Sequence, residues 1–259
     1  MRWVLIFVFA ATVARAGPLG EVSADVVVLG EVHDNPAHHL VQAEATAAIK
    51  PAAVVFEMLT EAQAARITDD LRADPEALAE VLEWWASGWP DFAIYYPVFQ
   101  AAGSARIVGA AVPRERTRTA MRIGIARAFG AGAERYGLAD ALLAEELAPR
   151  LNLQLDAHCG AIPVEVLPDL VDVQRLRDAV LARAALAALE ETGGPVVVIT
   201  GNGHARRDWG VPAYLARVAP GVTVFVLGQS EAGRVPEGGF DMVLDADPVT
   251  RADPCAGFE

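Results

Sequence analysis

Residues 26–39 read Val26-Val27-Val28-Leu29-Gly30-Glu31-Val32-His33-Asp34-Asn35-Pro36-Ala37-His38-His39. The four apolar residues at the start are typical of a buried strand, and Asn35 followed by Pro36 is typical of a helix N-terminus. A strand, a tight turn and a helix are therefore expected here, with Glu31 and His33 in the turn. Because ligands of open α/β sheets bind where parallel strands end, this turn is the first candidate site.

Four further apolar runs, at 52–56, 105–112, 195–200 and 222–227, are also predicted to be strands. Unbroken runs rich in valine and isoleucine are typical of parallel strands that are buried on both faces. We therefore expect an α/β fold with a mostly parallel central sheet of about five strands flanked by helices. A helical insertion at about 114–192 separates the third and fourth strands. Residues 240–244 are a candidate antiparallel edge, and Pro97 is expected to begin a short helix.

Residues 1–16 have the pattern of a cleaved signal peptide: Arg2, an apolar run over 3–13, and a small-x-small site at 14–16. No cysteine follows the cleavage point, so acylation as a lipoprotein is not expected. The mature chain, residues 17–259, is expected to form a single domain in the periplasm or outside the cell. Cys159 and Cys255 either pair in that oxidising compartment or stay free, and the sequence leaves both open.

The charge balance narrows the range of partners. The formal net charge is -13, from 34 acidic and 21 basic residues. Binding to nucleic acid needs a clustered basic surface, so no nucleic-acid partner is expected.

Ionisable side chains follow three of the predicted strands. Glu31 and His33 follow the first, Glu57 the second and His204 the fourth. If these strands are parallel neighbours, the four side chains meet at one edge of the sheet. Such a set can bind a divalent metal or act as acid and base on water. The alternative for Glu57 is a helix cap or a partner for an arginine.

Other candidates have two interpretations each. His158 is either a ligand or a packed loop residue, and His39 is expected to be an exposed residue of a helix start. An aromatic group either covers a flat ligand or belongs to the core: Trp84, Trp85, Trp89, Phe92, Tyr95 and Tyr96. An arginine stripe either grips carboxylates or forms a solvated helix face: Arg114, Arg118 and Arg122.

Several motifs resemble those of the ChaN-type haem-binding proteins. They are the stretches 30–39 (GEVHDNPAHH), 54–58 (VVFEM), 88–92 (GWPDF), 158–160 (HCG), 174–178 (QRLRD), 201–206 (GNGHAR) and 207–212 (RDWGVP). This family is similar to a wider superfamily that includes TIKI metalloproteases and erythromycin esterases. The wider group shares the strand-end Gly-Glu-x-His and glutamate pattern.

The resemblance implies an exported haem-binding protein of bacterial haem and iron uptake. It implies a homodimer with haem near the subunit contact, and an outer-membrane haem receptor system as a further partner. It places Glu31, His33, Glu57 and His204 at the core of the site. It also implies a tyrosine as the iron ligand, for which Tyr136, Tyr95 and Tyr96 are the candidates. The other candidate haem contacts are His33, His204, His158, Arg114 and Arg118. ChaN-type proteins are often lipoproteins, and the lack of an acylation cysteine is a departure from that pattern.

Three hypotheses follow. The first is a haem-binding protein that is not an enzyme. The second is an esterase- or peptidase-like hydrolase that uses His33 as base or metal ligand, Glu31 and Glu57 to orient water, and His204 beside them. The third is a divalent-metal site that serves the structure.

Overall fold

The structure is a computed structural model that describes residues 18–253 and 255–256. These residues form one six-stranded sheet with the order β3-β2-β4-β1-β5-β6, in which every strand pairing is parallel. β1 lies inside the sheet, where Val26 pairs with Val196 of β4 and Val224 of β5. The strands are β1 Val26–Leu29, β2 Ala53–Phe56, β3 Arg106–Gly109, β4 Val196–Ile199, β5 Val224–Glu231 and β6 Met242–Ala246.

Helices connect the strands and form an insertion between β3 and β4, as expected. The insertion contains α7 Arg114–Ile123, α8 Ile125–Phe129, α9 Ala144–Ala157 and α10 Leu167–Thr192. The other helices are η1 Pro18–Glu21, α1 Pro36–Ile49, α2 Glu61–Ala64, α3 Asp69–Arg72, α4 Pro75–Val81, α5 Trp84–Ser87, α6 Phe92–Ala101, α11 Asn202–Ala205 and α12 Val211–Val218.

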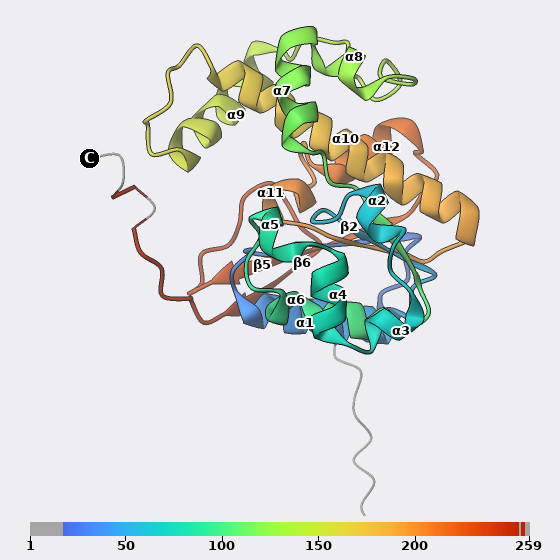
Figure 1. Cartoon of the computed structure of the whole chain (residues 1–259). Helices are drawn as coiled ribbons and strands as arrows, with labels where there is room; N and C mark the ends of the chain where they lie inside the picture. Colours follow the sequence, from blue (N-terminus) through green and yellow to red (C-terminus); the bar gives the residue numbers. More distant parts are fainter. Residues whose placement is uncertain (1–17, 254, 257–259) are drawn as a thin grey trace, which may run out of the picture.

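Both faces of the sheet are covered by helices (Figure 1). Alternate residues of a strand point to opposite faces, so β1 contributes to two cores. Val26 and Val28 pack in the core shared with α10 and α12. Val27 and Leu29 pack in the core shared with α1, α4 and α6. This burial on both faces explains why the strands are unbroken apolar runs.

The insertion is tied to the rest of the fold through α10. In Figure 1, α7, α8 and α9 lie beyond α10, away from the sheet. The buried guanidinium of Arg175 donates hydrogen bonds to the carbonyl groups of Gly137 and Asp140, both at 2.9 Å. These bonds fix the loop between α8 and α9 against the long helix.

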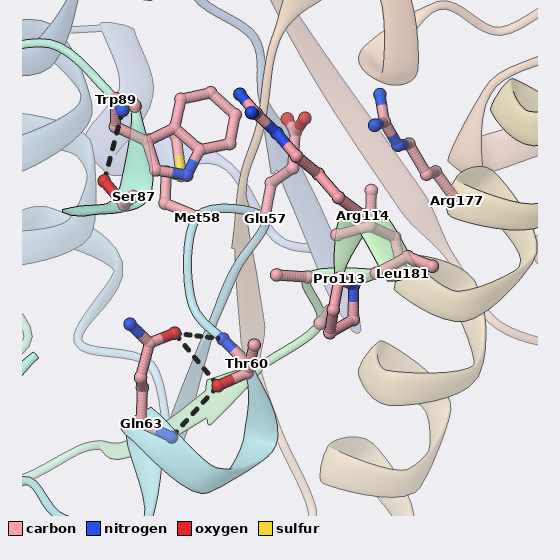
Figure 2. Close-up of a pocket in the computed structure, with 14 residues that line it drawn as sticks. Glu57, Met58, Thr60, Gln63, Ser87, Trp89, Pro113, Arg114, Arg177 and Leu181 are labelled. Atoms are coloured by element: carbon pink, nitrogen blue, oxygen red, sulfur yellow. Dashed lines mark hydrogen bonds between the residues drawn. The ribbon is translucent and has the colours of Figure 1, made fainter. Parts of the chain in front are cut away.

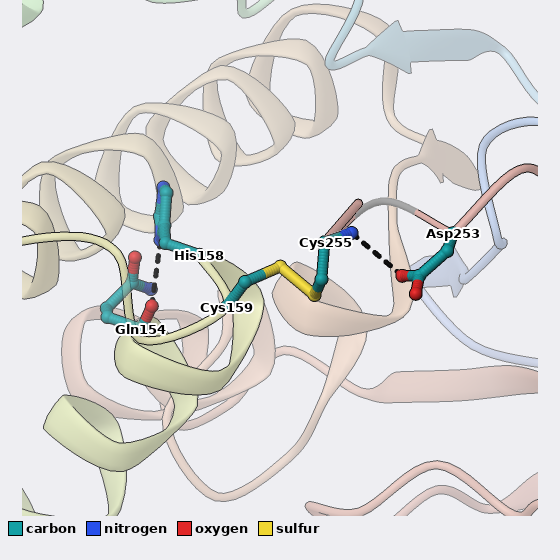
Figure 3. Close-up of a disulfide and its surroundings, with 5 residues drawn as sticks. All are labelled: Gln154, His158, Cys159, Asp253 and Cys255. Atoms are coloured by element: carbon teal, nitrogen blue, oxygen red, sulfur yellow. Dashed lines mark hydrogen bonds between the residues drawn. A yellow bond between two sulfur atoms is a disulfide. The ribbon is translucent and has the colours of Figure 1, made fainter. Parts of the chain in front are cut away.

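A disulfide ties the C-terminal segment to the insertion. Cys159, after α9, is bonded to Cys255, and their Cα atoms lie 5.5 Å apart (Figure 3). Before it reaches α9, the same segment is held against the loop after β1, because Arg251 pairs with Asp34 and Glu231. The two cysteines that the sequence left open are therefore paired.

The expected antiparallel edge is wrong, because β6 runs parallel to β5. The chain returns along β5 before it enters β6, and Asp241 holds this return in place. The backbone N–H of Asp241 donates to the carbonyl of Val226 at 3.0 Å, and its carboxylate accepts from the N–H of Val226 at 2.7 Å. β6 therefore starts beside the first half of β5 and follows its direction.

The expected start of a helix at Pro97 is also wrong, since Pro97 lies inside α6. The helix begins at Phe92, five residues before Pro97, and Asp91 is its N-cap. The side chain of Asp91 accepts a hydrogen bond from the N–H of Ala93 at 2.9 Å. A strong N-cap upstream therefore outweighs the preference of proline for the first turn.

The predicted signal peptide at 1–16 lies outside the described residues. No helix within 18–253 and 255–256 is long and apolar enough to cross a membrane. The prediction of a single domain over 17–259 stays a prediction.

Candidate functional site

The turn after β1 leaves no room for a side chain at Gly30. A Cβ there would lie 2.4 Å from Oδ1 of Asn202, so the two strand-end loops touch. Asn35 then caps α1, since its side-chain oxygen accepts a hydrogen bond from the first turn of that helix at 3.0 Å. The predicted strand, turn and helix are therefore present, and Glu31 and His33 stand in the turn.

Glu31 is buried, and both of its carboxylate oxygens are hydrogen-bonded. Oε1 lies 2.7 Å from Nδ1 of His33 and accepts from the hydroxyl of Tyr95 at 2.9 Å. Oε2 accepts from the side-chain amide of Gln42 at 2.8 Å. A buried carboxylate is costly unless its oxygens are paired, and here three donors pair them.

His33 is fixed by Glu31 and remains accessible. Because a carboxylate can only accept, Nδ1 of His33 carries the proton and Nε2 is left as the acceptor or ligand atom. The side chain is 38% exposed. Its ring meets the ring of Trp89 edge to face, with centroids 4.9 Å apart. Burial lowers the pKa of His33, but the hydrogen bond to Glu31 and the charge of Glu57 outweigh it, so the pKa is raised.

A second buried chain of charged groups starts at Glu57, directly after β2. Its Oε2 accepts from the hydroxyl of Thr200 at 2.6 Å and from the N–H of Gly201 at 2.9 Å. Oε1 lies 3.4 Å from Nε2 of His204, and Nδ1 of His204 lies 2.6 Å from Oδ1 of Asp178 on α10. His204 therefore stands between two carboxylates.

These contacts decide which form of His204 is present. Burial lowers the pKa of the imidazole, but the charges of Glu57 and Asp178 outweigh burial and raise the pKa to about 9. Burial raises the pKa of Glu57, yet the nearby imidazole groups and its hydrogen bonds leave that pKa well below the usual range. At neutral pH the pair is an imidazolium and a carboxylate.

The two carboxylate–histidine pairs are neighbours at the edge of the sheet. A Cβ at Gly201 would lie 2.9 Å from both Cε1 and Nε2 of His33 and 3.9 Å from Oε2 of Glu57. Glycine is therefore required for the ring of His33 to approach the loop after β4. The structure brings together the four side chains that the sequence singles out, from positions 31, 33, 57 and 204.

The four side chains are paired two by two, Glu31 with His33 and Glu57 with His204. Across residues 18–253 and 255–256, no group of three or more His, Cys, Asp or Glu side chains is arranged to hold a metal ion. Glu31 is saturated by its donors, and His204 is enclosed by two carboxylates. In the structure these side chains form two carboxylate–histidine pairs, and a divalent metal held by Glu31, His33, Glu57 and His204 stays a prediction.

The three candidate tyrosines lie in different surroundings. Tyr95 is fully buried and donates to Glu31, and burial together with that carboxylate strongly raises its pKa. Tyr96 donates to a backbone carbonyl of α3 at 3.0 Å. Tyr136 is buried in the insertion, with its ring 5.0 Å from that of Phe129. None of the three is a free phenol beside His33.

Of the other three histidines, His38 and His39 are buried beside the turn, and His158 is half-buried in the insertion. His38 and His39 are fully buried, so the expectation of an exposed His39 is wrong. Nδ1 of His38 accepts from the N–H of Val32 at 2.9 Å, and Nε2 of His39 lies 2.8 Å from the carbonyl of His33. Both rings hold the turn in place. His158 is half-buried after α9, with Nδ1 donating to the carbonyl of Gln154 at 2.8 Å.

A cavity of about 340 Å³ adjoins the second pair at Glu57. Glu57 and Trp89 line it together with Arg114 and Arg177. Figure 2 shows Arg114 extending from the start of α7 towards Trp89 and Glu57, with Arg177 beyond Glu57 in this view. Arg118, one turn after Arg114, is exposed and is not among the lining residues.

Asp178, Arg177 and Gln42 belong to this site but were not predicted from the sequence. Asp178 and Arg177 are adjacent in a long helix whose other buried residues are mostly alanine, leucine and valine. Both residues fall in the stretch 174–178 (QRLRD) that resembles the ChaN-type proteins, and this stretch was the signal that could have identified them. Gln42 lies one turn after His38 and His39, on the buried face of α1.

The comparisons with known proteins identify the family of the chain. A family model described as "Haem-binding uptake, Tiki superfamily, ChaN" matches residues 22–215, a range that includes all four strand-end side chains. The chain belongs to this ChaN family. A structure of cofacial haem binding to ChaN of Campylobacter jejuni matches with a TM-score of 0.60 and 19% identity, over 82% of this chain and 84% of that one. The shared fold is thus the ChaN fold.

A second solved structure, the type III effector HopBA1, matches with a TM-score of 0.43 and 14% identity, over 86% of this chain and 88% of that one. No curated protein matches the chain.

The buried chain of charges makes a testable prediction. In Asp178→Asn, the hydrogen bond to Nδ1 of His204 is kept but the negative charge is lost. The pKa of His204 should therefore fall from about 9 in the wild type towards its usual value near 6.5. NMR titration of the histidine ring nitrogens measures both values. A wild-type pKa near 6.5, or no change in the variant, would contradict the assigned charges.

Proposed function

We propose that the protein binds haem at the edge of the sheet beside His33 and takes part in bacterial haem and iron uptake. Membership of the ChaN haem-binding uptake family supports the ligand class. The observation that carries the site is the hydrogen bond of 2.7 Å between Nδ1 of His33 and the buried Glu31.

This hydrogen bond suits an iron ligand. A histidine that binds a metal through one ring nitrogen usually donates from the other to a carboxylate or carbonyl, which fixes the ring and increases its basicity. Histidine is also a common axial ligand of haem iron. His33 meets both conditions, whereas His204 is enclosed by carboxylates and Tyr95 already donates to Glu31. We therefore assign the iron contact to Nε2 of His33.

The surroundings of His33 suit a flat, partly apolar ligand that is only partly enclosed. Trp89 provides an aromatic surface next to the His33 ring. The adjoining cavity of about 340 Å³ is at the low end of the range of roughly 300–1,000 Å³ for small-molecule sites, so a porphyrin would extend beyond it. A second copy of the chain is the proposed cover for the remaining face. Cofacial haem binding by the Campylobacter jejuni protein is consistent with this homodimer.

We also propose that the protein acts outside the cytoplasm, in the periplasm or secreted. The signal-peptide pattern at 1–16 supports export. The disulfide between Cys159 and Cys255 supports an oxidising compartment. An outer-membrane haem receptor system is the proposed partner in this location.

Replacing the iron contact tests the proposal. His33→Ala should abolish the saturable Soret shift that hemin gives with the wild type, because the assigned ligand nitrogen is removed. His158→Ala is the matched control, since its Nδ1 is also held by an acceptor, but it lies after α9 and is not among the residues that line the cavity with Trp89. Titration with hemin at stoichiometric concentrations measures both. An unchanged titration of His33→Ala, or loss only in His158→Ala, would contradict the assignment.

A hydrolase is the second candidate function, and one observation favours it. The contact that suits an iron ligand also suits a general base, because Glu31 leaves Nε2 of His33 free to take a proton from water. The carboxylate of Glu57 lies on the next loop, close enough to raise the pKa of His33. Simple haem ligation does not require the buried Glu57 and His204 pair.

Glu57→Gln separates the two functions. On the hydrolase hypothesis, the wild type should hydrolyse a small activated ester such as p-nitrophenyl acetate with saturation, and the variant should lose about a hundredfold or more in kcat. Hemin binding should be retained, because Glu57 is not the assigned iron contact. Equal rates for the wild type, Glu57→Gln and His33→Ala would remove the enzyme hypothesis.

A further inference from the structure

Two arginines from different parts of the insertion line the cavity next to Glu57. Arg114 is the first residue of α7 and Arg177 lies in α10, so they are 63 residues apart in the chain but face one space. The guanidinium of Arg114 also passes Gly88, where a Cβ would lie 3.6 Å from Nη2. The cavity is thus lined by two positively charged side chains, Arg114 exposed and Arg177 partly buried.

Within the described part of the chain, neither arginine has an acidic partner. Glu57, the carboxylate that lines the same cavity, forms its ion pair with His204. Among the residues that the structure describes, no carboxylate lies within 4.0 Å of the guanidinium of Arg114 or Arg177. This is notable in a chain with 34 acidic and 21 basic residues. Nine other arginines are paired with acids: Arg66, Arg72, Arg106, Arg175, Arg206, Arg207, Arg217, Arg234 and Arg251.

The cavity also has an apolar part, beside the polar side chains of Thr60, Gln63 and Ser87. Trp89, Val112 and Leu181 line it beside the two guanidinium groups. The cavity therefore combines an apolar wall with a cationic edge, and an amphipathic ligand with a flat apolar body and carboxylates at one side is complementary to it. Arginine binds carboxylates through two parallel N–H···O bonds, which gives both affinity and orientation.

We propose that Arg114 and Arg177 form a clamp for the carboxylate groups of the ligand. The inference rests on the proposed function, and on that function the carboxylates are the two propionates of haem. The clamp orients the macrocycle so that its carboxylate edge enters the cavity while the ring lies towards Trp89 and His33. It also makes the site selective for porphyrins that carry free carboxylates.

Hemin and its dimethyl ester test the clamp, because they share the iron and the macrocycle but the ester lacks both carboxylate charges. The wild type should bind hemin more tightly than the diester, about tenfold or more, as expected for charge-assisted hydrogen bonds. The double variant Arg114→Ala/Arg177→Ala should lose this preference through weaker hemin binding, with diester affinity unchanged. Arg118→Ala, on an exposed position of the same helix, is the control and should behave as the wild type.

The outcomes separate the clamp from the proposed function. Saturable hemin binding with equal affinity in the wild type and the double variant would overturn the clamp alone. Equal losses for hemin and diester in the double variant would also overturn it, because the effect would not depend on carboxylates. Failure of the wild type to bind hemin at all would contradict the proposed function and the clamp with it. Circular dichroism of the variants shows that each retains the fold.

Discussion

The buried carboxylate of Glu31 is the constraint on which the site depends. A charge at the end of an interior strand is stable only when its oxygens are fully hydrogen-bonded, and three side chains from α1, α6 and the turn itself supply the donors. His33 is one of them. The position of the His33 ring is therefore set by the need to satisfy Glu31, and this leaves Nε2 as the ring nitrogen that does not contact the carboxylate.

The parallel sheet brings the pair formed by Glu57 and His204 next to Glu31 and His33. β4 lies between β1 and β2, so the loops that carry Glu31, Glu57 and His204 all leave one edge of the sheet. Gly201 allows the closest contact between them, since a side chain there would collide with the His33 ring. Asp178 on α10 completes the chain of charges and connects the site to the insertion. The insertion also provides both arginines of the cavity.

The sequence predicted the parts of the molecule that local chemistry determines. The apolar runs predicted the strands, and Asn35-Pro36 predicted the start of α1. Strand-end positions predicted that Glu31, His33, Glu57 and His204 meet. The contribution of α10 was not predictable in this way, because the positions of Arg177 and Asp178 depend on how a 26-residue helix packs on the sheet. The direction of β6 follows from the return of the chain along β5, where both the backbone and the side chain of Asp241 are hydrogen-bonded to Val226.

The pairing within the site was also beyond sequence analysis. Four ionisable groups at one edge are equally compatible with a metal cage, an acid–base set and two ion pairs. The choice depends on distances of a few ångströms and on partners such as Gln42 and Tyr95, which are set by packing. The fully buried His39 shows the same limit, since a helix-start histidine is exposed or buried according to what covers it.

The most direct test of the account is a crystal structure of the protein grown with hemin. The iron is expected within bonding distance of Nε2 of His33. Nδ1 should still be hydrogen-bonded to Glu31, and the porphyrin should lie next to Trp89. Iron bound to Tyr136 or His158, with His33 away from the haem, would contradict it.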